Sequence, residues 1–468
     1  MAQQVNTTAI LGEATLAELR AGLRGELLTR EDEGYETQRK VWNGMVDKHP
    51  LLIARCMGTA DVISAVQFAR SHGLLVAVRG GGHNVAGNAT CDDGMVIDLS
   101  PMKGIWVDSQ HRLARAQPGA TWGDLDRETQ ALGLATTGGI VSTTGIAGLT
   151  IGGGIGWLTR KYGLACDNLI AVDLVTAEGQ LIRASADTNA DLFWGVRGGG
   201  GNFGVVTSFE YRLHPVKVVL GGFALYAMEQ SRAALRVFRD LCATAPDELT
   251  MLATFFTAPA EEYVPEHLRG QHAFAVFVCH CGSLEEAQET IRPLRALVLP
   301  AADFIAPMPY ARLQALLDDE FPAGLRSYWR SAYLGDLSER VVDTLIAHAT
   351  NMPEAPSGID IHQMGGAAGR VAADATAFGH RDAPFLVNMV ATWADAAHDE
   401  RNVTWVRQLS AALQPETTGI YVNFLANDGQ QAVQASYDTQ TYERLTALKT
   451  TYDPTNLFRL NQNIAPRA

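Results

Sequence analysis

Four clusters of glycine residues mark places where the backbone can approach a ligand closely. They are Arg79-Gly-Gly-Gly-His83, Thr143-Thr-Gly-Ile-Ala-Gly148, Gly152-Gly-Gly-Ile-Gly156 and Arg197-Gly-Gly-Gly-Gly-Asn-Phe-Gly204. Without a Cβ atom, glycine lets main-chain N–H groups close on a phosphate or a flat ring, and successive turns form anion-binding nests. Any one cluster is explained by a tight turn, but ordinary turns rarely need three consecutive glycines. Together, the four clusters predict a cradle for a nucleotide-like ligand.

The common nucleotide motifs do not explain this cradle. Residues 199–204 match the letters G-x-G-x-x-G, but the alternating, β-branched residues after them predict a strand where the Rossmann mechanism needs a helix N-terminus. No Gly-Lys-Ser/Thr of a P-loop occurs. H-E-x-x-H and G-x-S-x-G are missing too, which excludes the commonest zinc-protease and serine-hydrolase sites.

His83 is the most interesting single residue, because it follows three glycines in a loop that leaves a predicted buried strand. The imidazole is thereby placed beside whatever those glycines approach. A loop histidine on its own is usually solvated or capping a turn, so the residue alone leaves its role open.

The elements that position these residues are a mixture of strands and helices. Residues 51–80 read as strand, helix and strand, and residues 169–185 read as two strands joined by an Ala-Glu-Gly turn. Residues 14–46 read as helical. Beyond Pro215, amphipathic helices alternate with apolar strands, and the last helix ends at Tyr452-Asp-Pro-Thr. We therefore predict an α+β fold.

Composition excludes several classes of protein. The chain has 468 residues, 47% hydrophobic and 19% charged, which predicts a globular protein of two packed domains or one composite unit rather than a disordered one. A net charge of −14 disfavours nucleic-acid and anionic-membrane partners. The start shows no signal peptide and the six cysteines fit reduced thiols, so we expect a cytoplasmic protein without a membrane span.

Four stretches together resemble the FAD-linked oxidases of the vanillyl alcohol oxidase and p-cresol methylhydroxylase superfamily, in its berberine bridge enzyme-like branch. They are residues 76–89, 142–169, 191–216 and 452–464. The resemblance extends from about Pro50 to Ile464. It implies a two-domain VAO/PCMH-type α+β fold, in which an FAD-binding domain joins a substrate domain with an antiparallel sheet. The implied divisions are 1–46, a helical segment on the FAD domain, 47–216, the FAD domain, 217–425, the substrate domain, and 426–468, the return to the FAD domain.

The resemblance also implies which residues hold FAD. His83 matches the histidine that bonds covalently to the flavin. Other cofactor-binding positions carried over are Arg79, Gly80, Gly81, Gly82, Asn84, Val141, Thr143, Thr144, Gly145, Gly148, Gly152, Gly153, Gly154, Asn202, Gly204, Val205, Val206, Asn461 and Gln462.

Two cysteine features bear on the chemistry. Bicovalent relatives carry a cysteine where this chain has Val141, so the resemblance implies one covalent bond, through His83, and no 6-S-cysteinyl bond. Cys166 is interpreted as a small packing residue. Cys279-His280-Cys281 lies in an alternating strand with its thiols on one face and its imidazole on the other, and no second C-x-x-C completes a ligand set, so we predict no metal.

Substrate-side residues follow from the same resemblance. Tyr421-Val-Asn423 is similar to the family's Y-x-N motif; in a strand the two side chains would share one face, with Tyr421 as the base. A tyrosine near pKa 10 needs support as phenolate, for which Arg381 and His380 are candidates. Weaker pocket candidates, for which core packing is an equal alternative, are Tyr328, Trp329, Arg330, His362 and Gln363.

The resemblance therefore implies an FAD-dependent oxidase that removes a hydride from an alcohol or amine carbon of a small molecule, with O₂ as the acceptor and H₂O₂ as the product. Sugars, secondary alcohols and aromatic or alkaloid-type compounds all stay open as substrates. A dehydrogenase of the same fold, a non-catalytic flavin-binding protein and a nicotinamide-dependent reductase are alternatives. The sequence leaves monomer and homo-oligomer equally open.

Overall fold

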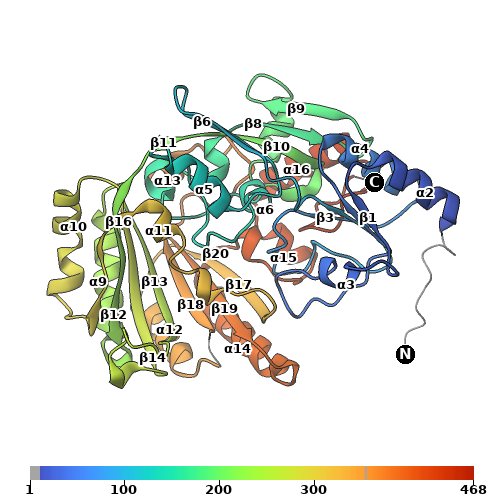
Figure 1. The fold of residues 1–468 in the computed structure, drawn as a ribbon. Helices are drawn as coiled ribbons and strands as arrows, with labels where there is room; N and C mark the ends of the chain where they lie inside the picture. The colour runs from blue at the N-terminus through green and yellow to red at the C-terminus, as the bar shows by residue number, and fades with distance from the viewer. Residues whose placement is uncertain (1–10, 354–355, 468) are drawn as a thin grey trace.

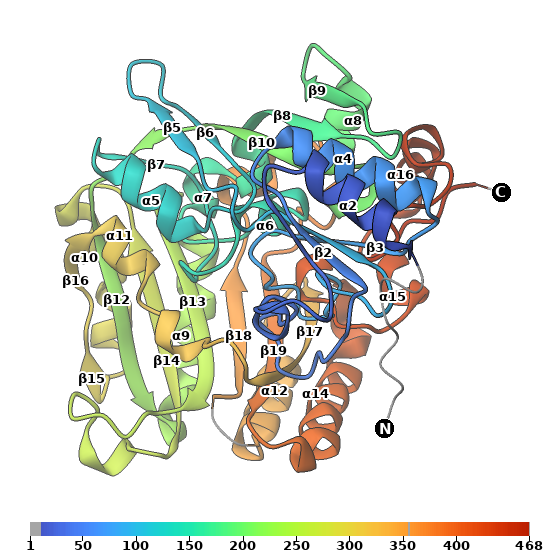
Figure 2. The ribbon, with the colours of Figure 1, turned by 45° about the vertical axis from the view of Figure 1, so that its right-hand side comes forward.

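The structure is a computed structural model that describes residues 11–353 and 356–467. Figures 1 and 2 show two parts: small sheets and short helices from the first half of the chain, and a broad sheet with long helices behind it from the second. No helix in residues 11–353 and 356–467 is long and apolar enough to cross a bilayer.

The strand, helix and strand predicted near residues 51–80 are present. They are β2 (Leu52–Arg55), α4 (Thr59–Ser71) and β3 (Val76–Arg79), and β2 and β3 both pair in parallel with β4 (Met95–Asp98). α4 buries Val62, Ala65, Val66 and Ala69, a stripe at helical spacing, against these strands. The end of β3 therefore presents the first glycine cluster from a rigid sheet.

The N-terminal segment differs from its prediction as a continuous helix. It contains α2 (Glu13–Gly22), the edge strand β1 (Glu26–Leu28) antiparallel to β2, and the short α3 (Tyr35–Gln38). Glycines explain the interruption: a Cβ at Gly25 would lie 1.8 Å from the Arg55 carbonyl oxygen, and Gly34 has φ 90°. The segment thus completes a sheet as well as covering one.

A five-stranded antiparallel sheet has one strand that begins directly after the fourth glycine cluster, and it confirms the strands predicted for residues 169–185 and 205–213. Its order is β5-β6-β10-β8-β9. The bounds are β5 (Ile105–Asp108), β6 (Leu113–Ala116), β8 (Leu169–Val175), β9 (Leu181–Ser185) and β10 (Val205–Arg212), with a two-stranded pair β7 (Leu134–Ala135) and β11 (His214–Pro215) and the helices α5 (Trp122–Gln130), α6 (Ile146–Ile151), α7 (Thr159–Tyr162) and α8 (Ala190–Gly195).

The second half of the chain forms a nine-stranded sheet in which every pairing is antiparallel. The strands are β12 (Val218–Ala227), β13 (Leu249–Thr257), β14 (His272–His280), β15 (Ala302–Asp303), β16 (Ala306–Pro309), β17 (Arg326–Leu334), β18 (Gly358–Gln363), β19 (Phe385–Trp393) and β20 (Thr417–Gly419). Four long helices cover one face: α9 (Ser231–Thr244), α10 (Leu284–Ala296), α12 (Glu339–Thr350) and α14 (Asp399–Leu413). The shorter α11 (Tyr310–Gln314) and α13 (Gly366–Arg370) lie near the first part of the chain. The sheet's other face is turned toward the glycine-rich part (Figure 2).

The C-terminal segment returns to the first part of the chain. After α15 (Gln430–Gln434), the predicted last helix is α16 (Thr439–Tyr452), which packs on α8. Leu457 and Phe458 then join the core around β2 and β4. Lys449 lies fully buried and holds this return: its Nζ atom donates to the carbonyls of Asn202 and Phe458 and pairs with Asp453.

Candidate functional site

An elongated channel runs along the glycine clusters. It consists of two cavities of about 210 and 160 Å³ that share six lining residues, so we describe them as one channel. The shared residues are Val78, Gly80, Asn84, Ala89, Gly148 and Asn423. A larger cavity of about 590 Å³, here called the large cavity, lies beside the channel under the nine-stranded sheet.

The loop after β3 lines the channel with unused backbone donors. Among the described residues, the N–H groups of residues 80–84 donate to no other protein group. Gly82 has φ 72°, a conformation that favours glycine, and a Cβ at Gly81 would lie 2.6 Å from Gly145, so the first two glycine clusters touch. A run of free N–H groups in a tight turn is a nest for an anionic group.

Gly148, on α6, shows that the channel is a space the protein itself does not fill. A Cβ built there would meet no protein atom within 4 Å, yet the residue lines both parts of the channel. Steric packing inside the protein does not require this glycine. Its missing side chain keeps the channel open for a ligand.

His83 lines the channel as a neutral imidazole. Its ring stacks on the indole of Trp42, with centroids 5.4 Å apart and planes 18° from parallel. Burial lowers the pKa of His83 to about 4, against the opposing effects of the Thr143 backbone and the Asp318 charge. At neutral pH the ring therefore keeps a lone pair that is free to form a bond. Trp42 comes from the N-terminal segment, and no sequence motif predicted its position beside His83.

The far end of the channel is built by the fourth glycine cluster and the C-terminal return. Gly204, Val205, Val206, Asn461 and Gln462 line it, with Gly200 and Gly201. Asn461 donates to the carbonyls of Gly201 and Phe458, but its buried Oδ1 atom has no hydrogen-bond donor. An acceptor left unpaired in a channel wall is suited to a ligand donor.

Three of the predicted cofactor residues, Arg79, Asn202 and Thr143, do not line the channel. The Arg79 guanidinium pairs with Asp98 and donates to the carbonyls of Gln38 and Lys40, so it anchors the N-terminal segment. Asn202 bonds to the carbonyls of Gly199 and Gln462 and to the N–H of Ile464. Thr143 is exposed and reaches the site through its backbone beside His83. The remaining predicted positions, which do line the channel, are Gly80, Gly81, Gly82, Asn84, Val141, Thr144, Gly145 and Gly148.

Gly152, Gly153 and Gly154 allow close packing and support Tyr421. Added Cβ atoms would lie within 2.0–2.5 Å of Asn423, Phe378 and Ala165 respectively. The Gly154 N–H donates to the Tyr421 hydroxyl at 2.9 Å. These three glycines therefore line neither part of the channel, whereas Ile155 of the same cluster does line it.

Tyr421 and Asn423 lie together, but not on the strand that the sequence predicted. Residues 422–424 form a 3₁₀ turn after β20, because the ladder with β17 ends at Gly419. Asn423 lines the channel and donates its Nδ2 to the Tyr421 hydroxyl at 2.9 Å and to the Leu149 carbonyl. Burial raises the pKa of Tyr421 well above its ordinary value, opposed by Gly154 and Asn423. Tyr421 itself lines neither the channel nor the large cavity.

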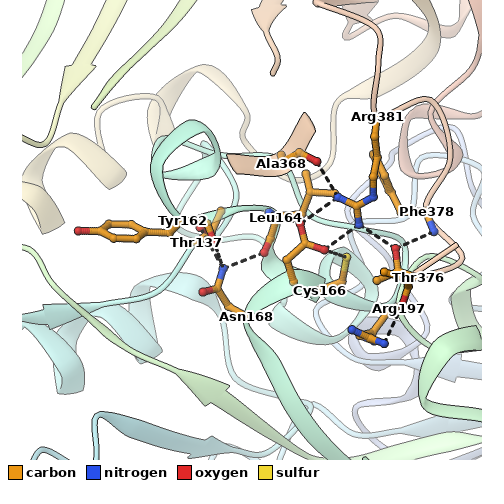
Figure 3. A network of polar contacts seen from close by, with 12 residues as sticks. Thr137, Tyr162, Leu164, Cys166, Asn168, Arg197, Ala368, Thr376, Phe378 and Arg381 are labelled. Carbon is orange, nitrogen blue, oxygen red and sulfur yellow. Dashed lines mark hydrogen bonds and ion pairs between the residues drawn. The ribbon is translucent and has the colours of Figure 1, made fainter. Parts of the chain in front are cut away.

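Arg381 forms a buried ion pair away from Tyr421. Its guanidinium bonds to both carboxyl oxygens of Asp167, at 2.7 and 3.0 Å, and to Ala368 and Thr376, as Figure 3 shows around the labelled Arg381. Cys166, beside this pair, is fully buried outside the channel. The His380 ring packs 5.2 Å from that of Tyr333. The donors to Tyr421 are therefore Gly154 and Asn423 rather than Arg381 or His380.

The remaining substrate candidates separate by strand face. On β17, Trp329 lines the channel, whereas Tyr328 and Arg330 point the other way and bond to Asp428. On β18, Gln363 points to the face of the sheet away from the channel, where its Oε1 atom accepts a hydrogen bond from the Met251 N–H. His362 is buried beside the Phe424 ring, and burial lowers its pKa to about 4.

Sequence reasoning missed Asp360, which lines both the channel and the large cavity. It shares its face of the sheet with its cross-strand partners Thr254 and Asn388. Thr254 donates to Asp360 at 2.7 Å, and burial raises the pKa of Asp360 to about 6 despite that bond. Asn388 lines the channel, and its buried Oδ1 lacks a donor. A lone aspartate in an apolar strand carries no motif, but its cost of burial is a signal of function.

Comparison with known proteins agrees with this geometry. The family model described as an FAD binding domain matches residues 50–185, and one described as berberine and berberine like matches residues 420–465. The chain is 34% identical to (R)-6-hydroxynicotine oxidase of Paenarthrobacter nicotinovorans over 95% of this chain and 97% of that protein. It is 32% identical to an uncharacterised FAD-linked oxidoreductase of Bacillus subtilis, with 95% and 97% covered.

Solved structures share the fold. The crystal structure of 6-hydroxy-D-nicotine oxidase from Arthrobacter nicotinovorans superposes with a TM-score of 0.86 at 33% identity, covering 95% of this chain and 98% of that one. A chitooligosaccharide oxidase superposes with a TM-score of 0.84 at 22% identity, covering 97% and 100%. At that identity the second likeness shows the fold alone.

Proposed function

Because the chain belongs to the berberine bridge enzyme-like family of FAD-linked oxidoreductases, we propose that it is an oxidase for a small alcohol or amine. In this proposal O₂ is the electron acceptor and H₂O₂ the second product. The observation that carries it is the position of Asp360, a buried carboxyl shared by the channel and the large cavity. A substrate in the large cavity reaches the channel past that carboxyl.

The channel fits FAD in shape and in chemistry. The free N–H groups of residues 80–84 suit the pyrophosphate, the open face of Gly148 leaves room for an extended chain, and the unpaired Asn461 Oδ1 offers an acceptor at the far end. When bound, FAD supplies the two-electron acceptor for a hydride from the substrate carbon. We propose His83 as its covalent attachment point and, with Val141 in place of a cysteine, as the only one.

The protein's own task is to take the substrate's N–H or O–H proton and to position the reacting group. We propose that the Asp360 carboxylate takes that proton, since its raised pKa leaves it ionised at neutral pH and basic enough to accept. Tyr421 holds the amide of Asn423 against the channel, which makes the pair positioning residues in this proposal.

Flavin reoxidation separates this proposal from its nearest alternative. We expect substrate-reduced enzyme, mixed with air-saturated buffer in a stopped-flow instrument, to regain its flavin absorbance within a second and to release H₂O₂. Return over many seconds, with fast return on adding an artificial acceptor, would identify a dehydrogenase. No bleaching by any member of an alcohol, amine and sugar panel would leave a flavin-binding protein without turnover.

The His83 attachment has its own test. After denaturation in acid and separation from small molecules, wild-type protein is expected to stay yellow and His83→Ala to release its colour. His111→Ala is a matched control, because His111 is exposed and pairs only with Asp108. Colour in the wild-type filtrate would refute the attachment.

A further inference from the structure

The large cavity has the size and walls of a site for a small apolar molecule. Its volume of about 590 Å³ lies within the range typical of small-molecule sites. Aromatic and aliphatic side chains make most of the wall, among them Phe223, Leu225, Phe256, Phe277 and Phe304. An oligosaccharide, with a hydroxyl on nearly every carbon, would leave most of those groups without a partner against such walls.

The charge inside the cavity is negative and has no protein counterion. Asp360 is 9% exposed, and burial and the Thr254 bond alone set its pKa, with no cation acting on it. The cavity's basic residue, Arg312, is exposed. Asp303, also in the wall, is neutralised by Arg295 at 2.6 Å. Glu320, the other carboxyl in the wall, is exposed, so Asp360 is the buried carboxylate that lacks a cation among the described residues of the wall.

A second acceptor lies across from this carboxylate. Asn388 is the cross-strand partner of Asp360, is 3% exposed and lines the channel, and its Oδ1 atom has no donor. Two adjacent acceptors match a group with two or more N–H donors better than a hydroxyl, which has one. A buried carboxylate also favours a cationic donor.

We propose that the substrate is an apolar amine whose nitrogen binds between Asp360 and Asn388 and whose hydrocarbon body fills the large cavity. This inference rests on the proposed oxidase function, because it names the substrate of that same site. It selects amines from the three substrate classes, alcohols, sugars and amines, that the resemblance leaves open.

The probes are 4-phenylbutylamine, its neutral counterpart 4-phenylbutan-1-ol, and cellobiose. Binding to the holoenzyme is measured at pH 7.5, by perturbation of the flavin absorbance and by quenching of tryptophan fluorescence. We expect the amine to bind at least about tenfold more tightly than the alcohol, the effect of one charge-assisted hydrogen bond, and cellobiose to bind more weakly than both. Equal affinity for amine and alcohol, or preference for cellobiose, would overturn the inference.

Variants test whether Asp360 and Asn388 cause the preference for the amine. Asp360→Asn is expected to remove the amine preference and to keep the affinity for the alcohol, and Asn388→Ala to reduce the preference. Asp303→Asn, the same change in the same cavity at a carboxyl already paired, should keep it. Preference retained in Asp360→Asn would contradict the assignment. If the enzyme produced peroxide from alcohols and showed no preference for the amine, the amine inference would be wrong and the oxidase proposal would hold. If it preferred the amine but turned over no substrate, the oxidase proposal would be wrong and the amine inference would hold.

Discussion

Asp360 carries a cost in stability that its proposed role explains. A carboxyl whose pKa is about 6 in the folded protein and near its ordinary value in the unfolded chain binds its proton more tightly when folded. Folding stability is therefore reduced above pH 6 and recovers as the pH falls from 6 toward 4. Such a buried, unpaired charge is expected where function rather than packing selects the residue.

Asp360→Asn should consequently stabilise the protein and strongly reduce turnover. We expect a gain in the free energy of unfolding of at most about 3 kcal/mol at pH 8, shrinking toward pH 4, measured by urea unfolding of the holoenzyme. In wild type, kcat/KM should rise with pH through about 6 as Asp360 ionises, and the variant should lack this rise. Asp303→Asn, which breaks an existing ion pair, should not stabilise. Unchanged turnover in Asp360→Asn would return the role of base to Tyr421.

What the sequence could predict at this scale depends on whether a residue acts through its backbone or its side chain. Gly80, Gly148 and His83 each lie in a short glycine-rich stretch of consecutive residues, so their place at the channel was predictable. The directions of the Arg79 and Arg381 side chains are set by Asp98 and Asp167, partners distant in sequence. Asp360 owes its importance to β13 and β19, which no local motif describes.

At the scale of elements, the C-terminal return depends on one buried cation. Lys449 on α16 bonds to the carbonyl of Asn202 in the fourth glycine cluster and to that of Phe458, and burial lowers its pKa against the effect of Asp453. Asp453 in turn accepts from the N–H groups of Leu457 and Phe458. The helix and the proline after it were predictable from the sequence, but this clamp joins residues 247 apart.

Lys449→Met tests the clamp. It leaves the buried Asp453 charge without its cation and the Asn202 carbonyl without its donor, so we expect a loss of about 3–5 kcal/mol in the free energy of unfolding. The flavin content of the purified protein should fall as well, because Asn461 and Gln462 follow directly. Thr451→Ala, at an exposed position on the same helix, should change stability by less than about 0.5 kcal/mol. Full flavin content in Lys449→Met would show that the return holds without its cation.

At the scale of the molecule, the broad sheet was the hardest feature to foresee. Its order, β15-β12-β14-β13-β18-β19-β17-β20, pairs strands far apart in sequence, and periodicity alone does not fix such pairings. The alternation of helices and apolar strands predicted its class. We keep the division of the chain at residues 216 and 217 as a proposal, with the N-terminal segment bridging both parts.

That bridge is made by residues 42–44, which lie along residues 324–327, where the chain enters strand β17 of the broad sheet. Gly44 and Gly324 donate to the carbonyls of Leu325 and Trp42, and the Trp42 indole donates to the carbonyl of Phe321. Asn43, 2% exposed, donates to the carbonyls of Val85 and Ser327 and accepts from the Ser327 N–H. One amide thus connects the His83 loop with β17, and its neighbour Trp42 stacks on His83.

Asn43→Ala should therefore weaken both parts at once. Losing the amide leaves three buried backbone groups unpaired, and we expect about 3 kcal/mol less stability to urea. Because Trp42 would lose its anchor beside His83, the fraction of protein with acid-stable flavin should fall in the same variant. Asn351→Ala is the matched control, since its amide bonds only to an exposed helix carbonyl, and it should leave both quantities unchanged. A destabilised Asn43→Ala with full acid-stable flavin would mean that the bridge holds the two parts together without positioning His83, and the loop would then owe its geometry to the glycine contact between Gly81 and Gly145 alone.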